Sequence, residues 1–237
     1  AASRNSKGRA IHNFLELPPG ENINALINYS SKKAAGSFLV MATKEGLVKK
    51  TPLKDFANIR RNGIIAIALK KGDLLRGVGL SGGGDQILLT TKLGQSIRFD
   101  EKQIRPMGRN AAGVRAVRLK GGDEVAGFDV VKGGAASEKR RLLTVMAHGF
   151  AKQTPLKEYR LQRRGGSGIK AAKVTAKTGP IVSAHIVDNE SELFALSAKG
   201  QVLRTGLGSV RVTSRSAQGV RIMNLKAGDK LAGTVVV

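Results

Sequence analysis

A motif of apolar strand, short turn, glycine and second strand occurs four times along the 237-residue chain. The four hairpins are Phe38–Leu53, Gln86–Phe99, Arg141–Leu156 and Glu192–Leu207. Their turn glycines are Gly46, Gly94, Gly149 and Gly200, and an apolar residue follows ten positions later in each case: Phe56, Ile104, Tyr159 and Val210. A fixed period of roughly 20–50 residues is typical of solenoids and propellers. The chain is therefore predicted to be an array of similar units.

A second glycine opens another strand in each unit, at Gly63, Gly113, Gly168 and Gly219. After Gly113 and Gly219 this strand alternates apolar and basic residues, so one face is expected to be buried and the other basic. A Gly-Asp turn at Asp73, Asp123 and Asp229 then leads into a last apolar strand, whereas the third unit has Thr178-Gly179-Pro180 there. Four short strands per unit indicate a propeller-like blade.

We predict one all-β domain over residues 1–237, with about five four-stranded blades of which the first is incomplete. The partial blade covers residues 1–35, and the further units cover 36–85, 86–135, 136–190 and 191–237. The N-terminal segment matches only the second half of a unit. Two explanations stay open: a fragment of a longer protein, or a ring closed by residues outside this chain.

The charge is strongly positive, since 41 Lys and Arg face 17 Asp and Glu for a net charge of +24. Such an excess indicates a polyanionic partner. Aromatic residues make up 4% and Trp is absent, so few side chains are available to stack on the bases of a single strand. Duplex DNA is therefore the expected target. The absence of Cys excludes disulfides and thiolate metal sites. The sequence contains neither a long apolar run nor a signal peptide, so it predicts no membrane-spanning segment.

No catalytic constellation is evident. Tyr159 occupies a slot otherwise filled by Phe, Ile and Val, so it is predicted to be a core residue. His12, His148 and His185 occupy non-equivalent positions without metal-ligand spacing. The recurring Asp residues are predicted to be turn residues, and a phosphate-binding loop is missing. We expect a non-enzymatic domain with no metal and no cofactor.

Basic residues, by contrast, follow the repeat and are predicted to form a curved track for duplex phosphates. Those after the turn glycines are Lys49, Lys50, Arg98, Lys152 and Arg204. Those in the loops before the second glycines are Arg60, Arg61, Arg105, Arg109, Arg163, Arg164, Arg211 and Arg215. Those on the strands that follow are Arg115, Lys170 and Arg221.

The loop Gln162-Arg163-Arg164-Gly165-Gly166-Ser167-Gly168 resembles the gyrase A box, the heptad Gln-Arg-Arg-Gly-Gly-Lys-Gly that marks the C-terminal domain of the bacterial DNA gyrase A subunit. Further similar pieces are Thr51–Phe56, Thr154–Tyr159, Arg105–Asn110 and the Gly-Val-Arg strand starts. The resemblance covers nearly the whole chain. It implies a β-pinwheel whose blades exchange strands, and in which Gln162, Arg163, Arg164, Gly165, Gly166 and Gly168 contact DNA.

The resemblance also implies a function and partners. The domain would wrap DNA to support ATP-dependent negative supercoiling, together with the rest of the gyrase A subunit, the gyrase B subunit in an A2B2 holoenzyme, and double-stranded DNA, in the cytoplasmic nucleoid. Ser167 replaces the usual basic residue, and the box lies in the third complete unit instead of the first. Three alternatives remain: the corresponding domain of the topoisomerase IV A subunit, a propeller-like scaffold for acidic proteins, and a nucleoid or ribosomal accessory protein.

Overall fold

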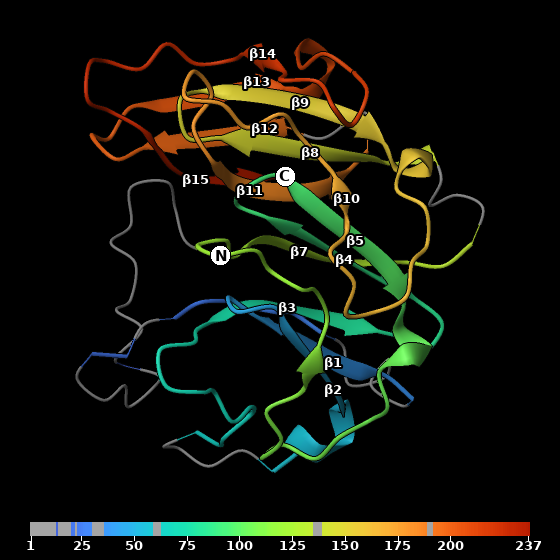
Figure 1. Cartoon of the computed structure of the whole chain (residues 1–237). Coiled ribbons are helices and arrows are strands. Elements are labelled where there is room, and N and C mark those ends of the chain that lie inside the picture. Colours follow the sequence, from blue (N-terminus) through green and yellow to red (C-terminus); the bar gives the residue numbers. More distant parts are fainter. Residues whose placement is uncertain are drawn as a thin grey trace.

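The protein is all-β in the residues that its computed structural model describes, which are 13, 20–21, 23–29, 36–58, 63–134, 139–188 and 192–237. Four antiparallel sheets follow one another in sequence order, from the blue end of Figure 1 to the red end. No α-helix occurs in these ranges, and no helix there could cross a membrane. The predicted fold class is confirmed, whereas most of the predicted partial blade 1–35 lies outside the described residues.

Each unit contributes a hairpin, a short 3-10 helix (η) and an inner strand. The hairpins are β1 (Phe38–Thr43) with β2 (Leu47–Pro52), β4 (Gln86–Thr91) with β5 (Gln95–Asp100), β8 (Arg141–Met146) with β9 (Phe150–Pro155), and β12 (Glu192–Ser197) with β13 (Val202–Gly206). The 3-10 helices are η3 (Leu53–Phe56), η4 (Glu101–Gln103), η6 (Leu156–Glu158) and η7 (Leu207–Ser209). The inner strands are β3 (Leu75–Ser81), β7 (Val125–Val131), β11 (Ile181–Val187) and β15 (Leu231–Val236).

The fourth strand of a sheet comes from the next unit. The donated strands are β6 (Val114–Arg115) on β2, β10 (Ile169–Lys170) on β5, and β14 (Val220–Arg221) on β9. The fourth sheet, β13-β12-β15, has three strands. Thus each of the later units supplies three strands to its own sheet and one to its predecessor, as the resemblance implied.

The donated strands are shorter than the predicted runs 113–119 and 219–225. Each donated strand pairs with an outer hairpin strand that begins just after the turn glycine. The backbone amides that follow the donated strand therefore donate to the carbonyl of that glycine. Ala116 N donates to Gly46 O at 2.8 Å, and Ile222 N donates to Gly149 O at 2.8 Å. Strand pairing with the preceding unit therefore stops at the hairpin turn.

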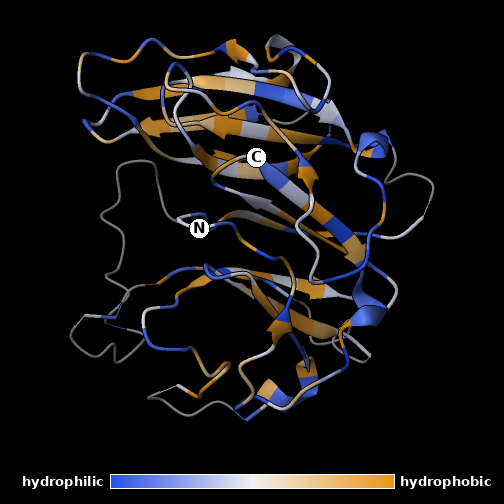
Figure 2. Cartoon of the chain, viewed as in Figure 1, coloured by the Kyte–Doolittle hydropathy of each residue, from blue (hydrophilic) through white to orange (hydrophobic). Residues whose placement is uncertain are grey.

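Consecutive sheets pack face to face, which explains why the hairpin strands are apolar on both sides. Ile87 and Leu89 of β4 point toward the first sheet and join a cluster with Val40 and Val48. Leu88, between them, points the other way and packs with Leu142 of the third sheet. Figure 2 shows the apolar colouring concentrated on these strands. The predicted core positions Phe56, Ile104, Tyr159 and Val210 are all buried.

The recurring aspartates are turn residues, as predicted. Asp73 Oδ1 accepts from Leu74 N at 2.8 Å and from Glu45 N, in the hairpin turn of the same unit, at 2.9 Å. Asp123 and Asp229 make equivalent bonds. In the third unit a backbone carbonyl replaces the carboxylate, because His148 N donates to Thr178 O at 2.9 Å. This accounts for the departure of that unit from the Gly-Asp pattern.

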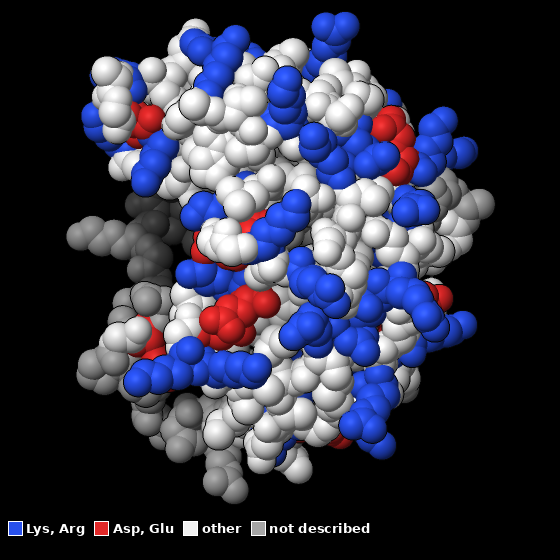
Figure 3. All heavy atoms as spheres, in the orientation of Figure 1, with Lys and Arg blue, Asp and Glu red and all other residues white. Residues whose placement is uncertain are grey.

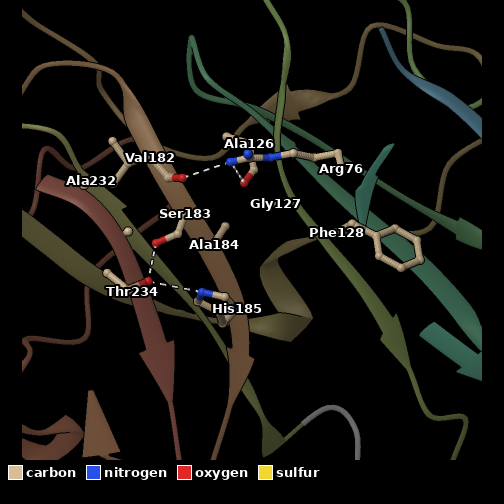
Figure 4. A pocket seen from close by; sticks show the side chains of 11 residues that line it. Arg76, Ala126, Gly127, Phe128, Val182, Ser183, Ala184, His185, Ala232 and Thr234 are labelled. Carbon is tan, nitrogen blue, oxygen red and sulfur yellow. Dashed lines mark hydrogen bonds between the residues drawn. The ribbon is translucent and has the colours of Figure 1, made fainter. Parts of the chain in front are cut away.

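The inner strands lie side by side around a cavity of about 260 Å³ (Figure 4). Arg76 of β3 reaches across it, and its Nη2 donates to Ala126 O at 2.9 Å and to Val182 O at 3.1 Å. Ser183 and His185 both bond to Thr234 Oγ1. Burial, reinforced by Arg76, lowers the pKa of His185. These polar groups bond to one another or to backbone carbonyls, so they link successive units.

Turn glycines at one repeat position differ in how crowded they are, which provides a matched test. Gly94 has φ +92°, and a Cβ there would lie 2.7 Å from Ala172 O of the next unit. Gly200 has φ +84°, and a Cβ there would meet no atom within 4 Å. Gly200→Ala should cost about 1–2 kcal/mol from the left-handed backbone alone, and Gly94→Ala should cost clearly more. Chemical denaturation of both variants measures the difference, and equal losses would contradict the close packing of units.

Candidate nucleic-acid interface

Three equivalent stretches, here called the rim segments, run along the outer edge of the preceding unit: residues 105–119, 160–174 and 211–225. Each first pairs in parallel with the outer hairpin strand, through the bridges Lys50↔Pro106, Arg98↔Leu161 and Gln153↔Val212. Each then forms a loop and returns as the donated strand β6, β10 or β14. The loops with the predicted DNA-binding residues therefore lie at the outermost edge of the sheets.

Exposed cations recur on these segments at fixed repeat positions. Eleven residues after the turn glycine lie Arg105, Arg160 and Arg211, and two residues after the second glycine lie Arg115, Lys170 and Arg221, all six exposed. Arg163, in the loop between them, is also exposed. Figure 3 shows Lys and Arg gathering toward the right of the view, where the ends of β5 and β9 and the adjacent 3-10 helices lie in Figure 1. The rim segments thus present a recurring positive surface.

Several exposed cations were not among the predicted site residues. Arg160 fills the slot of Arg105 and Arg211, and the repeat alignment alone could have identified it. The same alignment identifies an exposed lysine on each of three 3-10 helices, namely Lys54, Lys102 and Lys157. It also identifies an exposed cation shortly after the donated strands β6 and β10, namely Arg118 and Lys173. Their common signal is a basic residue that recurs at a fixed position of the repeat.

Four of the predicted DNA contacts are wrong. Lys49, Lys50, Arg98 and Lys152 are between 0% and 4% exposed, so their charged groups cannot reach a phosphate. They lie on hairpin strands that are covered at the outer edge by the next unit and are buried along most of their length. Their basic groups are used inside the protein.

Arg98 illustrates this internal role. Its Nη1 donates to Leu156 O at 3.1 Å and to Tyr159 O at 3.2 Å, both in the 3-10 region of the next unit. Gln153 fills the same slot one unit later, and its Nε2 donates to Leu207 O and Val210 O at 2.7 Å each. Lys50 Nζ similarly donates to Glu101 O at 3.1 Å. The side chain at this position donates hydrogen bonds that hold each unit to its successor. The neutral Gln153 in the series was the sequence signal for a hydrogen-bond donor rather than a phosphate contact.

The buried lysines serve the same purpose one residue earlier. Lys152 Nζ donates to Ser214 O at 2.8 Å and to Arg215 O at 2.6 Å, in the loop of the next rim segment. Burial lowers the pKa of Lys152 to about 8, opposed by Glu158 and reinforced by Arg215. Lys49 Nζ bonds to Ala66 O at 2.6 Å and to Arg109 O, and burial, reinforced by Arg109, lowers its pKa to about 8.

The remaining predicted residues fall into three groups. Arg109, Arg164 and Arg215 are half-buried. Arg204 is exposed, and its Nη2 forms an ion pair with Glu192 Oε2 at 2.9 Å. Arg60 and Arg61 lie outside the described residues.

The loop Gln162–Gly168 is held tightly against residues of the preceding unit. Gln162 N donates to Arg98 O at 2.8 Å, and Gly165 N donates to Ala116 O at 2.7 Å. Gly165 has φ +84°, and Gly168 has φ +75° with its Cα so near β5 that a Cβ would lie 2.5 Å from Ser96 O. Both positions therefore need glycine. Gly166 and Ser167 are exposed beside Arg163, so the accessible part of the loop is small and basic.

Within the described ranges no group of three or more His, Asp or Glu side chains is placed to hold a metal ion. The arrangement instead offers exposed guanidinium and ammonium groups on a hydrogen-bonded backbone. Such groups bind phosphate oxygens without reading base sequence.

Comparison with known proteins identifies the family. The family model of the DNA gyrase C-terminal domain, β-propeller, matches residues 37–81, 85–132, 142–188 and 191–237. The chain belongs to this DNA gyrase C-terminal domain family. It is 39% identical over 233 residues to the DNA gyrase A subunits of Staphylococcus aureus strains MRSA252 and NCTC 8325, covering 98% of this chain and 26% of each relative. It thus spans about a quarter of the length of these relatives.

Two solved structures share the fold. The C-terminal domain of DNA topoisomerase IV superposes with a TM-score of 0.89 at 22% identity, covering 97% of this chain and 70% of that one. The DNA gyrase A C-terminal domain superposes with a TM-score of 0.84 at 25% identity, covering 97% and 75%. Both matches agree with the all-β array of sheets described above.

Arg98 and Arg204 occupy the same repeat position, but Arg98 is buried and Arg204 is exposed. Substituting each one therefore distinguishes the contribution of a buried hydrogen-bond donor between units from that of a surface charge. Arg98→Met should lower the free energy of unfolding by roughly 1–3 kcal/mol, because buried carbonyls lose their donor. Arg204→Met should change it by about 1 kcal/mol or less, because it removes an exposed ion pair with Glu192 and a surface contact with the Phe194 ring. Urea denaturation of the two variants measures both values. Similar small losses at both positions would contradict the role of Arg98 as a donor between units.

Proposed function

We propose that this domain binds duplex DNA along the rim segments and bends it around the edge of the array. The observation that carries the proposal is the recurrence of exposed cations at equivalent rim positions in three successive units. Because the repeated units follow one another around the fold, these cations would form a curved series rather than a flat patch. A polyanion that follows the series must curve with it.

The energetics are compatible with bending. Smooth bending of 20–30 base pairs by 40–90° costs about 1–6 kcal/mol. Each rim segment carries at least two exposed cations, and each phosphate that they neutralise releases condensed counterions. Several contacts in each of three segments can offset the elastic cost. Preference among DNA sequences would then arise from deformability, since backbone contacts carry no base information.

As part of a gyrase A subunit, the domain would present this bent DNA to a breakage and reunion machinery located elsewhere in the assembly. We propose that it is non-catalytic by itself and that it supports ATP-dependent negative supercoiling in an A2B2 holoenzyme, formed with the rest of its own polypeptide and with the gyrase B subunit, in the bacterial cytoplasm. The S. aureus relatives at 39% identity are named as DNA gyrase, which supports gyrase over topoisomerase IV.

Ligation of a nicked circle in the presence of the domain tests wrapping directly. The expected result is a shift of the topoisomer distribution in one direction, growing with the amount of bound domain. The control is the same reaction without protein. An unshifted distribution at saturating domain would contradict wrapping, and binding without a shift would favour an accessory protein without topological bias.

The salt dependence of binding tests the proposed contacts. Arg160→Ala and Arg163→Ala should each reduce the slope of log K against log salt by about 0.9, the value for one lost phosphate contact. Lys230→Gln is the matched control, because Lys230 is exposed directly before the inner strand β15, outside the rim segments. Equal slopes for all three variants and the unmodified protein would exclude Arg160 and Arg163 as contacts.

A further inference from the structure

Arginine recurs four residues before the second glycine, at Arg109, Arg164 and Arg215, yet these side chains are half-buried. Arg163 lies directly beside Arg164 in the sequence and is exposed. The two adjacent arginines of the loop Gln162–Gly168 therefore have different surroundings. A shared role as phosphate ligands does not explain the difference.

The guanidinium of Arg164 is directed at the preceding unit. Its Nη1 donates to Arg115 O, and its Nε donates to Gln103 O at 3.3 Å. The backbone of Arg164 is also fixed, because its N donates to Gln103 Oε1 at 2.8 Å. Arg115 is one of the exposed rim cations. Arg164 therefore holds the backbone of Arg115 in place.

The same contact recurs one unit later. Arg215 Nη1 donates to Lys170 O at 3.0 Å, and Lys170 fills the repeat position of Arg115. Backbone hydrogen bonds join consecutive rim segments beside these contacts. Arg118 N donates to Gly166 O at 2.8 Å, and Lys173 N donates to Ala217 O at 3.2 Å. Two equivalent junctions with corresponding donors and acceptors indicate a repeated device.

We propose that Arg164 and Arg215 are positioning residues that fix the spacing between the exposed cations of neighbouring units, without binding phosphate themselves. This inference rests on the proposed function. In each junction the arginine ties its own loop to the carbonyl of the preceding unit's cation. The distance between Arg115 and Arg163 along the track is then set by the hydrogen bonds of Arg164.

The geometry explains why this position is arginine. The planar guanidinium presents several donors in a fixed fork, so Arg164 reaches Gln103 O and Arg115 O from one side chain. A lysine carries the same charge on a single nitrogen and cannot reproduce the fork. Charge and positioning can therefore be separated by one substitution.

The experiment compares Arg164→Lys with the control Arg140→Lys in the linking-number and salt-slope assays. Arg164→Lys should reduce the linking-number shift to about half or less, while keeping the salt slope within about 0.3 of the unmodified protein because the charge is retained. Arg140→Lys should leave both values unchanged, because Arg140 lies outside the rim segments and a lysine keeps the charge that pairs with Asp188. Arg215→Lys shortens the side chain that donates to Lys170 O, so it should also reduce the shift, and it serves as a second variant if Arg164→Lys unfolds.

The outcomes separate the two proposals. A full linking-number shift in both Arg164→Lys and Arg215→Lys would overturn the positioning role, and so would a slope reduced by about 0.9 in either variant. Failure of the unmodified domain to shift the linking number would instead overturn the proposed function. Thermal unfolding of each variant confirms that a reduced shift is measured on folded protein.

Discussion

The hydrogen bonds between consecutive units are the interaction on which the rest of this structure depends. The first three sheets each take their outer strand from the unit that follows. The same neighbour also receives the donors at the positions of Lys50, Arg98 and Gln153. A unit removed from its neighbours would leave a sheet edge and several buried polar groups unpaired, at a cost for each group. Stability is therefore a property of the array.

Basic residues serve two separate purposes in this arrangement. Those inside the hairpins, such as Arg98 and Lys152, donate to carbonyls of the next unit and are shielded from solvent. Those on the rim segments, such as Arg160 and Arg163, are exposed and available to an anionic partner. The net charge of +24 thus overstates the charge that DNA can meet. The half-buried Arg164 links the two groups, because it holds the backbone of a rim cation.

The aligned repeats carry more information about the basic residues than the net charge does. The neutral Gln153 in the series with Lys50 and Arg98 indicates a hydrogen-bond donor, and the apolar Ile97 in the slot of Lys49 and Lys152 indicates burial. Aligned positions also identify Arg160 as a rim cation. By contrast, nothing in the sequence separates Arg163 from Arg164, since both are arginines in one glycine-rich loop. Their difference arises from contacts to Arg115 and Gln103, which are distant in sequence.

The sequence by itself determined the repeat, the all-β class, the turn glycines and aspartates, and the core slots of Ile104 and Tyr159, because these follow from local backbone requirements and from periodic hydrophobicity. Tertiary structure decided the actual exposure of each cation. Strand donation covers the outer edge of a hairpin and sheet stacking covers its faces, so a basic residue on a hairpin strand becomes an internal donor while one on a rim segment stays exposed. That distinction depends on the neighbouring unit, and a single unit's residues do not encode it.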